Sequence, residues 1–115
     1  MFSGNYCMTQ VTEINPTNAH KMISNGEAIL IDVREHIEIT QNSIDDAIHV
    51  PMSAFDPSLI PVESGKKFIF LCTHGIRSFQ VSQYLISKGI IDDAYNLSGG
   101  LAAWIEAGLP TRSNP

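Results

Sequence analysis

Residues 71–78 read Leu-Cys-Thr-His-Gly-Ile-Arg-Ser and place a thiol between an apolar run and a segment of helical periodicity. The preceding run, residues 67–71, has the length and aromatic content of a strand. Apolar residues recur at helical spacing after the stretch, and we expect Ser78 to be the N-cap of a helix that extends to about Lys88. Cys72 is therefore expected where a strand ends and a loop leads into a helix.

The loop that follows Cys72 is short and has a glycine, Gly75, at its centre. Such a loop can form a ring of backbone amides, and the positive end of the helix dipole lies behind that ring. Both features stabilise a negative charge at the centre of the ring. Thiols in such settings have pKa values of roughly 3.5–7.5 instead of about 8.5. The loop therefore predicts a cradle for a Cys72 thiolate that acts as a nucleophile.

Composition limits the class of protein. A chain of 115 residues with 43% hydrophobic residues is long enough to bury one core without metal ions or disulfides. The net charge of −5 and the absence of a Lys/Arg cluster argue against a nucleic-acid or anionic-membrane surface. The second cysteine, Cys7, lies in a segment without periodicity, and no apolar run is long enough to span a bilayer. We expect a monomeric cytoplasmic protein with a free thiol.

Short apolar runs alternate with helical patterns along the chain, which predicts an α/β domain with a mostly parallel sheet and helices on both faces. Residues 34–42 fit a helix or a strand, and we favour the helix. Ligands bind beyond the carboxyl ends of the strands in such sheets, so residues 32–35 (Asp-Val-Arg-Glu) are expected near Cys72. The domain is expected over residues 9–110, with a loosely ordered segment before it (1–8) and a tail after it (111–115).

Three stretches together resemble the single-domain rhodanese-like sulfurtransferases. They are residues 30–35 (Leu-Ile-Asp-Val-Arg-Glu), residues 72–78, and residues 96–100 (Asn-Leu-Ser-Gly-Gly) with Trp104, Gly108 and Pro110. The resemblance implies a five-stranded parallel sheet flanked by helices. One departure occurs at residues 42–47, which read Asn-Ser-Ile-Asp-Asp-Ala where the family often has Gly-His-Ile-Pro-Gly-Ala. It leaves the geometry of that loop open.

The resemblance also implies a reaction. Cys72 would take a sulfane sulfur from a donor, become a persulfide, and pass the sulfur to a nucleophilic acceptor. Thiosulfate is the usual test donor of the family and cyanide the usual test acceptor, while thioredoxin or glutathione would be natural thiol acceptors. No cofactor is expected. Arg77 would order the loop and attract an anionic donor. The backbone amides of the loop would cradle the persulfide; these belong to Thr73, His74, Gly75, Ile76, Arg77 and Ser78.

Several side chains have two interpretations. His74 is either a second cation beside the thiol or an exposed loop residue. Asp32 and Arg34 are expected to support the site, Asp32 by bonding backbone groups near the loop and Arg34 by pairing with Glu35 or by approaching the donor. The other histidines lack the spacing of metal ligands, so no metal site is expected.

Two other functions compete with sulfur transfer. Cysteine phosphatases and arsenate reductases also combine a cysteine, an amide ring and an arginine, but they place five residues between the two. Here residues 73–76 are four, which favours a smaller ring suited to one sulfur atom. A non-catalytic binding module of the same fold is the second alternative, and the presence of both Cys72 and Arg77 argues against it.

Overall fold

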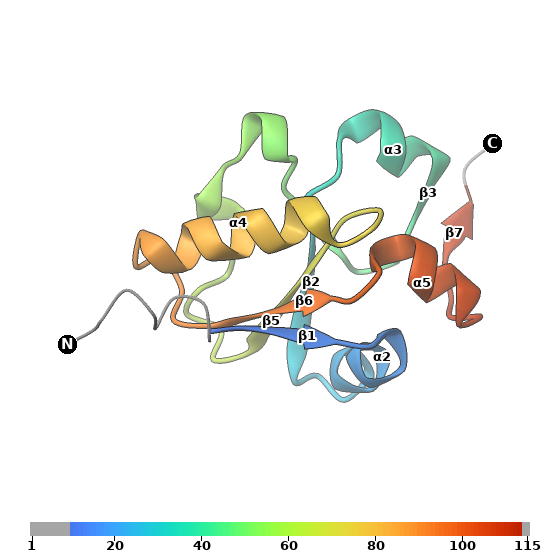
Figure 1. Cartoon of the computed structure of the whole chain (residues 1–115), viewed down its shortest axis with the longest axis horizontal. Helices are drawn as coiled ribbons and strands as arrows, with labels where there is room; N and C mark the ends of the chain where they lie inside the picture. The colour runs from blue at the N-terminus through green and yellow to red at the C-terminus, as the bar shows by residue number, and fades with distance from the viewer. Residues whose placement is uncertain (1–9, 114–115) are drawn as a thin grey trace.

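Five parallel strands form the central sheet in the computed structural model, which describes residues 10–113 (Figure 1). Their order across the sheet is β1-β6-β5-β2-β4. Strand β5 lies at the centre and pairs with β6 on one side and β2 on the other. This arrangement confirms the expected five-stranded α/β fold. The strands are β1 (Val11–Ile14), β2 (Ala28–Asp32), β4 (Ile48–His49), β5 (Lys67–Leu71) and β6 (Ala94–Leu97).

Helices cover both faces of the sheet (Figure 1). Helix α4 (Ile76–Ser87) lies on one face, and α2 (Pro16–Ser24) and α5 (Gly100–Glu106) pack on the other. Helix α2 begins as the sequence predicts, because the Asn15 side chain accepts a hydrogen bond from the Asn18 amide at 2.8 Å. The remaining helical segments are α3 (His36–Gln41) and the 3₁₀ turns η2 (Met52–Ala54) and η3 (Pro57–Leu59).

Alternation along β5 determines where the thiol points. Phe68 and Phe70 belong to the core beneath α4, whereas Ile69 and Leu71 belong to the core beneath α2 and α5. Cys72 continues this alternation and joins the α4 side. The thiol therefore lies beneath the first turn of α4 and not beneath α5.

The expected N-cap of the central helix is wrong by three residues. Helix α4 begins at Ile76, and its N-cap is Gly75, not Ser78. Gly75 adopts the left-handed conformation, with φ of 95°, which a residue with a side chain rarely adopts. Ser78 is consequently the third residue of the helix, where its amide has no partner within the helix and faces the loop.

The segment with two interpretations, residues 34–42, contains helix α3, as favoured. A two-residue strand, β3 (Asn42–Ser43), follows it and pairs antiparallel with β7 (Arg112–Ser113). The described part of the expected tail therefore lies against the domain. The expectations for residues 1–8 and Cys7 concern residues outside the described range.

Asp46 is the described non-glycine residue with a positive φ, at 71°. It occupies the fifth position of the 42–47 loop, where the family that this sequence resembles often has a glycine, so the backbone keeps a left-handed residue although the side chain differs.

The protein with glycine at position 46 should therefore be more stable than the protein with alanine there by about 1 kcal/mol. Urea unfolding of Asp46→Gly and Asp46→Ala, followed by the fluorescence of Trp104, measures this difference. At exposed Asp92, where φ is not positive, alanine should equal or exceed glycine; the same order at both positions would contradict the interpretation.

Candidate active site

The sulfur of Cys72 lies inside a cradle of hydrogen-bond donors. The Gly75 amide donates to Sγ at 3.1 Å and the Ser78 amide donates at 3.3 Å. The Ser78 hydroxyl oxygen also lies 3.3 Å from Sγ. The cysteine is only 1% exposed, so these groups take the place of water around the sulfur.

The cradle lowers the pKa of the Cys72 thiol. Burial of the sulfur opposes the charged form, and it is the largest single influence. The hydroxyl and amide of Ser78 and the amides of Gly75 and His74 together outweigh it. The net result is a pKa below the ordinary thiol value, so the thiolate population is raised at neutral pH.

The start of α5 holds the loop from behind. The Leu101 amide donates to the Cys72 carbonyl at 2.8 Å, and the Ala102 amide donates to the Thr73 carbonyl at 3.1 Å. These two carbonyls therefore point toward α5 and away from the sulfur. The opposite side of the loop, which carries the backbone amides, faces Sγ. The approach requires a glycine, because a Cβ at Gly100 would lie 2.4 Å from the Cys72 carbonyl oxygen.

Arg77 and Glu38 form one wall of the loop. The two nitrogens Nη1 and Nη2 of Arg77 donate to Oε1 and Oε2 of Glu38 at 2.8 and 2.9 Å. The Thr73 hydroxyl donates to Glu38 at 2.9 Å and accepts from Arg77 at 3.1 Å. The Arg77 hydrogen bonds, the largest influence, hold the pKa of Glu38 at about 2 despite partial burial. Arg77 thus orders the loop through Thr73, and its charge is balanced by a carboxylate.

Asn96 connects the cradle to the neighbouring strands. It pairs in register with Phe70 of β5 on one side and with Glu13 of β1 on the other. Its Oδ1 accepts from the Ser78 hydroxyl at 2.5 Å, while its Nδ2 donates to the Gly75 carbonyl at 3.0 Å and to Glu13 Oε2 at 3.0 Å. The buried amide therefore fixes both ends of the turn between Gly75 and Ser78.

Arg34 makes neither of the two contacts expected for it. Its side chain is 2% exposed and binds Asp32 through Nε and Nη2, with a further bond from Nη2 to the Asn42 carbonyl at 2.9 Å. It neither pairs with Glu35 nor approaches the thiol. Asp32 accepts from the Arg34 amide at 3.0 Å, so this pair braces the carboxyl end of β2. Glu35 instead forms a reciprocal capping box with Glu38 at the start of α3.

The structure thus brings most of the predicted loop residues together around one sulfur atom. Gly75 and Ser78 contact the sulfur, Thr73 and Arg77 form the wall, and the side chains at positions 74 and 76 are exposed. His74 contributes its backbone amide, and its imidazole belongs to the exposed rim.

Sequence reasoning missed three residues that complete the site. These are Glu38, Asn96 and Glu13. Asn96 and Glu13 could have been found from their positions near the carboxyl ends of β6 and β1, the edge at which Cys72 lies. Glu38 lies in the first turn of α3, and nothing in its local spacing indicates a contact with Arg77, which is 39 residues away in the chain.

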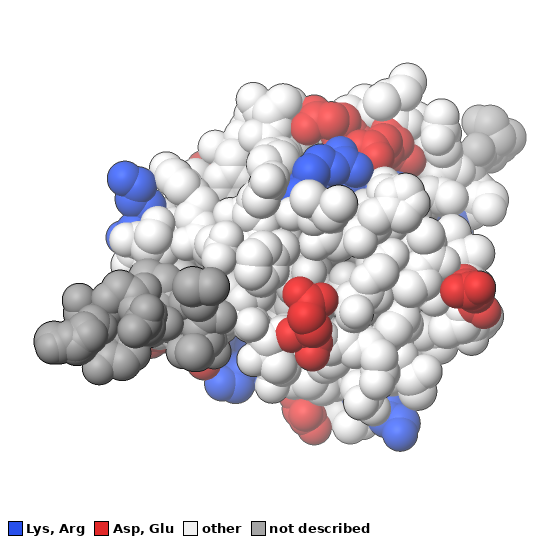
Figure 2. Space-filling model, viewed as in Figure 1, with Lys and Arg blue, Asp and Glu red and all other residues white. Residues whose placement is uncertain are grey.

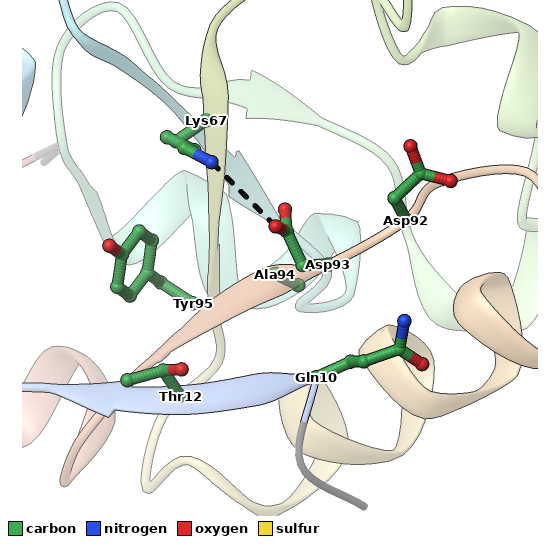
Figure 3. A pocket seen from close by; sticks show the side chains of 7 residues that line it. All are labelled: Gln10, Thr12, Lys67, Asp92, Asp93, Ala94 and Tyr95. Atoms are coloured by element: carbon green, nitrogen blue, oxygen red, sulfur yellow. Dashed lines mark ion pairs between the residues drawn. The ribbon is translucent and has the colours of Figure 1, made fainter. Parts of the chain in front are cut away.

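A separate cavity lies at the opposite edge of the sheet, where β1, β5 and β6 begin. Its volume is about 280 Å³, and Figure 3 shows the ion pair of Lys67 and Asp93, 3.6 Å apart, beside it. Its lining contains no thiol and no imidazole. Within residues 10–113 no cluster of three or more His, Cys, Asp or Glu side chains is arranged to hold a metal ion, and no helix is long and apolar enough to cross a membrane.

Comparisons with known proteins agree with this geometry. The profile of the rhodanese-like domain family matches residues 15–107. The chain is 32% identical to the thiosulfate sulfurtransferase GlpE of Actinobacillus pleuropneumoniae, over 86% of this chain and 91% of that protein. It is 39% identical to the uncharacterized protein slr1261 of Synechocystis sp., over 90% of this chain, and spans 56% of that protein's length. A rhodanese-related protein of Thermoplasma volcanium superposes with a TM-score of 0.76 at 28% identity, covering 88% of this chain and 97% of that one.

Substitution of Gly100 tests the contact between α5 and the loop. Gly100→Ala should lower the free energy of unfolding by at least about 2 kcal/mol more than Gly26→Ala does, because only the former places a Cβ against backbone atoms. Both glycines have positive φ, 64° and 76°, so the cost of the left-handed conformation is matched. In a Cys7→Ser background, the rate of Cys72 alkylation should fall in Gly100→Ala and stay unchanged in Gly26→Ala. Equal effects of the two substitutions would exclude the proposed role of the close approach.

Proposed function

The chain belongs to the rhodanese-like domain family, and we propose that it is a sulfurtransferase that carries a sulfane sulfur from a donor such as thiosulfate to a thiophilic acceptor. The observation that carries the proposal is the pair of amides from Gly75 and Ser78 that donate to a buried thiol of lowered pKa. Cys72 is the proposed nucleophile.

The reaction proceeds in two displacements. The Cys72 thiolate attacks the outer sulfur of thiosulfate, the S–S bond breaks, and sulfite leaves with its electron pair. Cys72 is left as a persulfide anion. An acceptor nucleophile, cyanide or a thiolate, then attacks the terminal sulfur and departs as thiocyanate or as its own persulfide, which restores the thiolate. No net proton transfer to a base is required when both nucleophiles arrive as anions.

The cradle suits this intermediate. Amides that bind the thiolate remain available for the terminal sulfur of the persulfide, and preorganised donors of this type contribute a few kcal/mol each to a developing charge. A phosphatase is less well supported. Its arginine must bind a phosphoryl group, whereas both terminal nitrogens of Arg77 bind Glu38. The four residues between Cys72 and Arg77 also favour a ring for one sulfur atom.

The acceptor that we propose is a thiol such as thioredoxin or glutathione, in the cytoplasm, with the protein acting as a monomer. A reducing compartment supports this choice, because it keeps Cys72 as a free thiol and supplies thiol acceptors. The side chains of Ile37 and Ile76, 68% and 69% exposed, lie next to Glu38 and Arg77 in the chain and offer apolar contact to such an acceptor.

Incubation with thiosulfate tests the intermediate directly. Intact mass measurement should show the gain of one sulfur atom, and the gain should disappear on addition of cyanide or a thiol. Cys72→Ser should gain none, while Cys7→Ser, which retains Cys72, should gain as much as the wild type. Sulfur uptake by Cys72→Ser, or none by the wild type with any sulfane donor, would refute the proposal.

Replacement of Arg77 should affect turnover more than folding. The ion pair with Glu38 is about one-third exposed, so its loss in Arg77→Ala should cost at most about 1 kcal/mol of stability. The value of kcat/KM for thiosulfate should fall by about tenfold, because the loop loses the bond to Thr73 and Glu38 is left without its cation. Steady-state cyanolysis measures the effect, and unchanged kinetics would contradict this role of Arg77.

A further inference from the structure

The thiol site has one lysine or arginine side chain within reach, and the charge of that side chain is balanced by a carboxylate. Of the seven lysines and arginines in the chain, Arg77 contacts the loop through the Thr73 hydroxyl. Arg34 and Arg112 are paired with Asp32 and Asp45. The lysines lie at the start of β5, in the last turn of α2 and beyond the end of α4, which is roughly 18 Å from its start. The cradle therefore stabilises an anion through amides, without a free cationic side chain.

Glu38 cancels the charge of Arg77 over the whole working range of pH. Its carboxylate is bonded to both terminal guanidinium nitrogens, and a pKa of about 2 keeps it ionised. Two further carboxylates lie nearby: Glu35 acts electrostatically on Arg77, and Glu13 binds Asn96 beside Gly75. The side chains around the loop thus carry an excess of negative charge.

The distribution of charged side chains on the surface agrees with this excess of negative charge. In Figure 2 acidic side chains border the basic patch that lies near the start of α4 and α3, and a further acidic patch lies lower on the same face. The carboxylates that border Arg77 on this face would repel a dianion that approaches it. The repulsion acts within a screening distance of about 10 Å at 0.1 M salt.

We infer that the site discriminates against dianionic donors and favours a sulfane sulfur carried on a zwitterionic or neutral group, with Glu38 as the specificity-determining residue that acts through Arg77. This inference rests on the proposed sulfur transfer. The chemistry of the step is unchanged: the Cys72 thiolate takes the outer sulfur of a thiosulfonate, R–SO₂–S⁻, and the sulfinate R–SO₂⁻ leaves with the electron pair. Only the net charge of the carrier differs.

Three donors of the same chemistry separate charge from reactivity. Thiosulfate is a dianion, methanethiosulfonate a monoanion, and 2-aminoethanethiosulfonate a zwitterion without net charge. The rate of persulfide formation on Cys72 is measured by intact mass in a Cys7→Ser background, at about pH 8, where an imidazole of ordinary pKa is uncharged. Each rate is divided by the rate at which the same donor transfers sulfur to free cysteine. The normalised rate should rise at least threefold for each negative charge removed, and the thiosulfate rate should rise with ionic strength.

Substitution of Glu38 separates the specificity role from a structural one. Glu38→Gln keeps an oxygen that can accept from Arg77 and Thr73 but removes the charge. It should raise loading from thiosulfate by about tenfold, leave loading from the zwitterionic donor within about twofold, and abolish or reverse the rise with ionic strength. Glu38→Asp, which restores the charge, should return the selectivity toward the wild type. Glu63→Gln, an exposed site in the turn before β5, is the control for net charge and should change nothing.

The outcomes distinguish this inference from the proposed function. If no donor loads Cys72, the proposed sulfur transfer fails. If all three donors load in proportion to their reaction with free cysteine, sulfur transfer stands and the charge selectivity is refuted. Equal losses for all donors in Glu38→Gln would assign Glu38 a purely structural role and would also overturn the inference. The wild-type donor series needs no variant, so it remains decisive if a substitution impairs folding.

Discussion

The hydrogen bonds from the first amides of α5 to the carbonyls of Cys72 and Thr73 are the constraint on which the site depends. A loop of four residues has few ways to satisfy its backbone, and a carbonyl directed at the sulfur would repel a thiolate. By binding these two carbonyls, Leu101 and Ala102 leave the opposite side of the loop to amides. The thiol of Cys72 then needs no base beside it, because the surrounding backbone already favours the anion.

The side-chain charges around this loop serve a different purpose from the amides. Arg77 and Glu38 hold each other and Thr73, which fixes one wall of the loop while their charges cancel. Such a pair, about one-third exposed, contributes little to global stability. Its main physical effects are to fix the local geometry of the loop and to keep the net charge at the entrance of the site low. The amides therefore stabilise the anion at the sulfur, while the side chains at the entrance do not attract highly charged donors.

The sequence was sufficient for the fold because local and global signals agree in this chain. The buried run of β5, the Asn15-Pro16 helix start and the glycine stops all specify what the sheet requires, and Cys72 follows β5 at the carboxyl edge. The start of α4 differs from the expectation because two signals compete. Serine is a preferred N-cap residue, but Gly75 adopts the left-handed conformation that the tight turn requires, and the helix therefore begins directly after Gly75. In a sequence such a turn cannot be distinguished from an ordinary loop.

The contacts that the sequence could not supply are long-range. Glu38 and Arg77 are 39 residues apart in the chain, and Glu13 and Asn96 are 83 apart. Each contact can therefore be predicted only once the strand order is known. Arg34 was misassigned for a related reason: its position at the carboxyl edge suggested a donor site, but burial of its guanidinium requires a carboxylate, and Asp32 is the nearest. Register and burial, not residue type, decide these assignments.

The central claim is that backbone amides, and not a cationic side chain, hold the charge of Cys72. Titration of the thiolate by its ultraviolet absorbance, in a Cys7→Ser background, tests it most directly when the wild type is compared with the double variant Glu38→Gln/Arg77→Gln. Removing both partners leaves no unpaired charge beside the loop. The account predicts a pKa below the ordinary thiol value of about 8.5 in both proteins. A wild-type thiol that titrates at the ordinary value, or a low pKa that returns to it when the pair is removed, would contradict the claim.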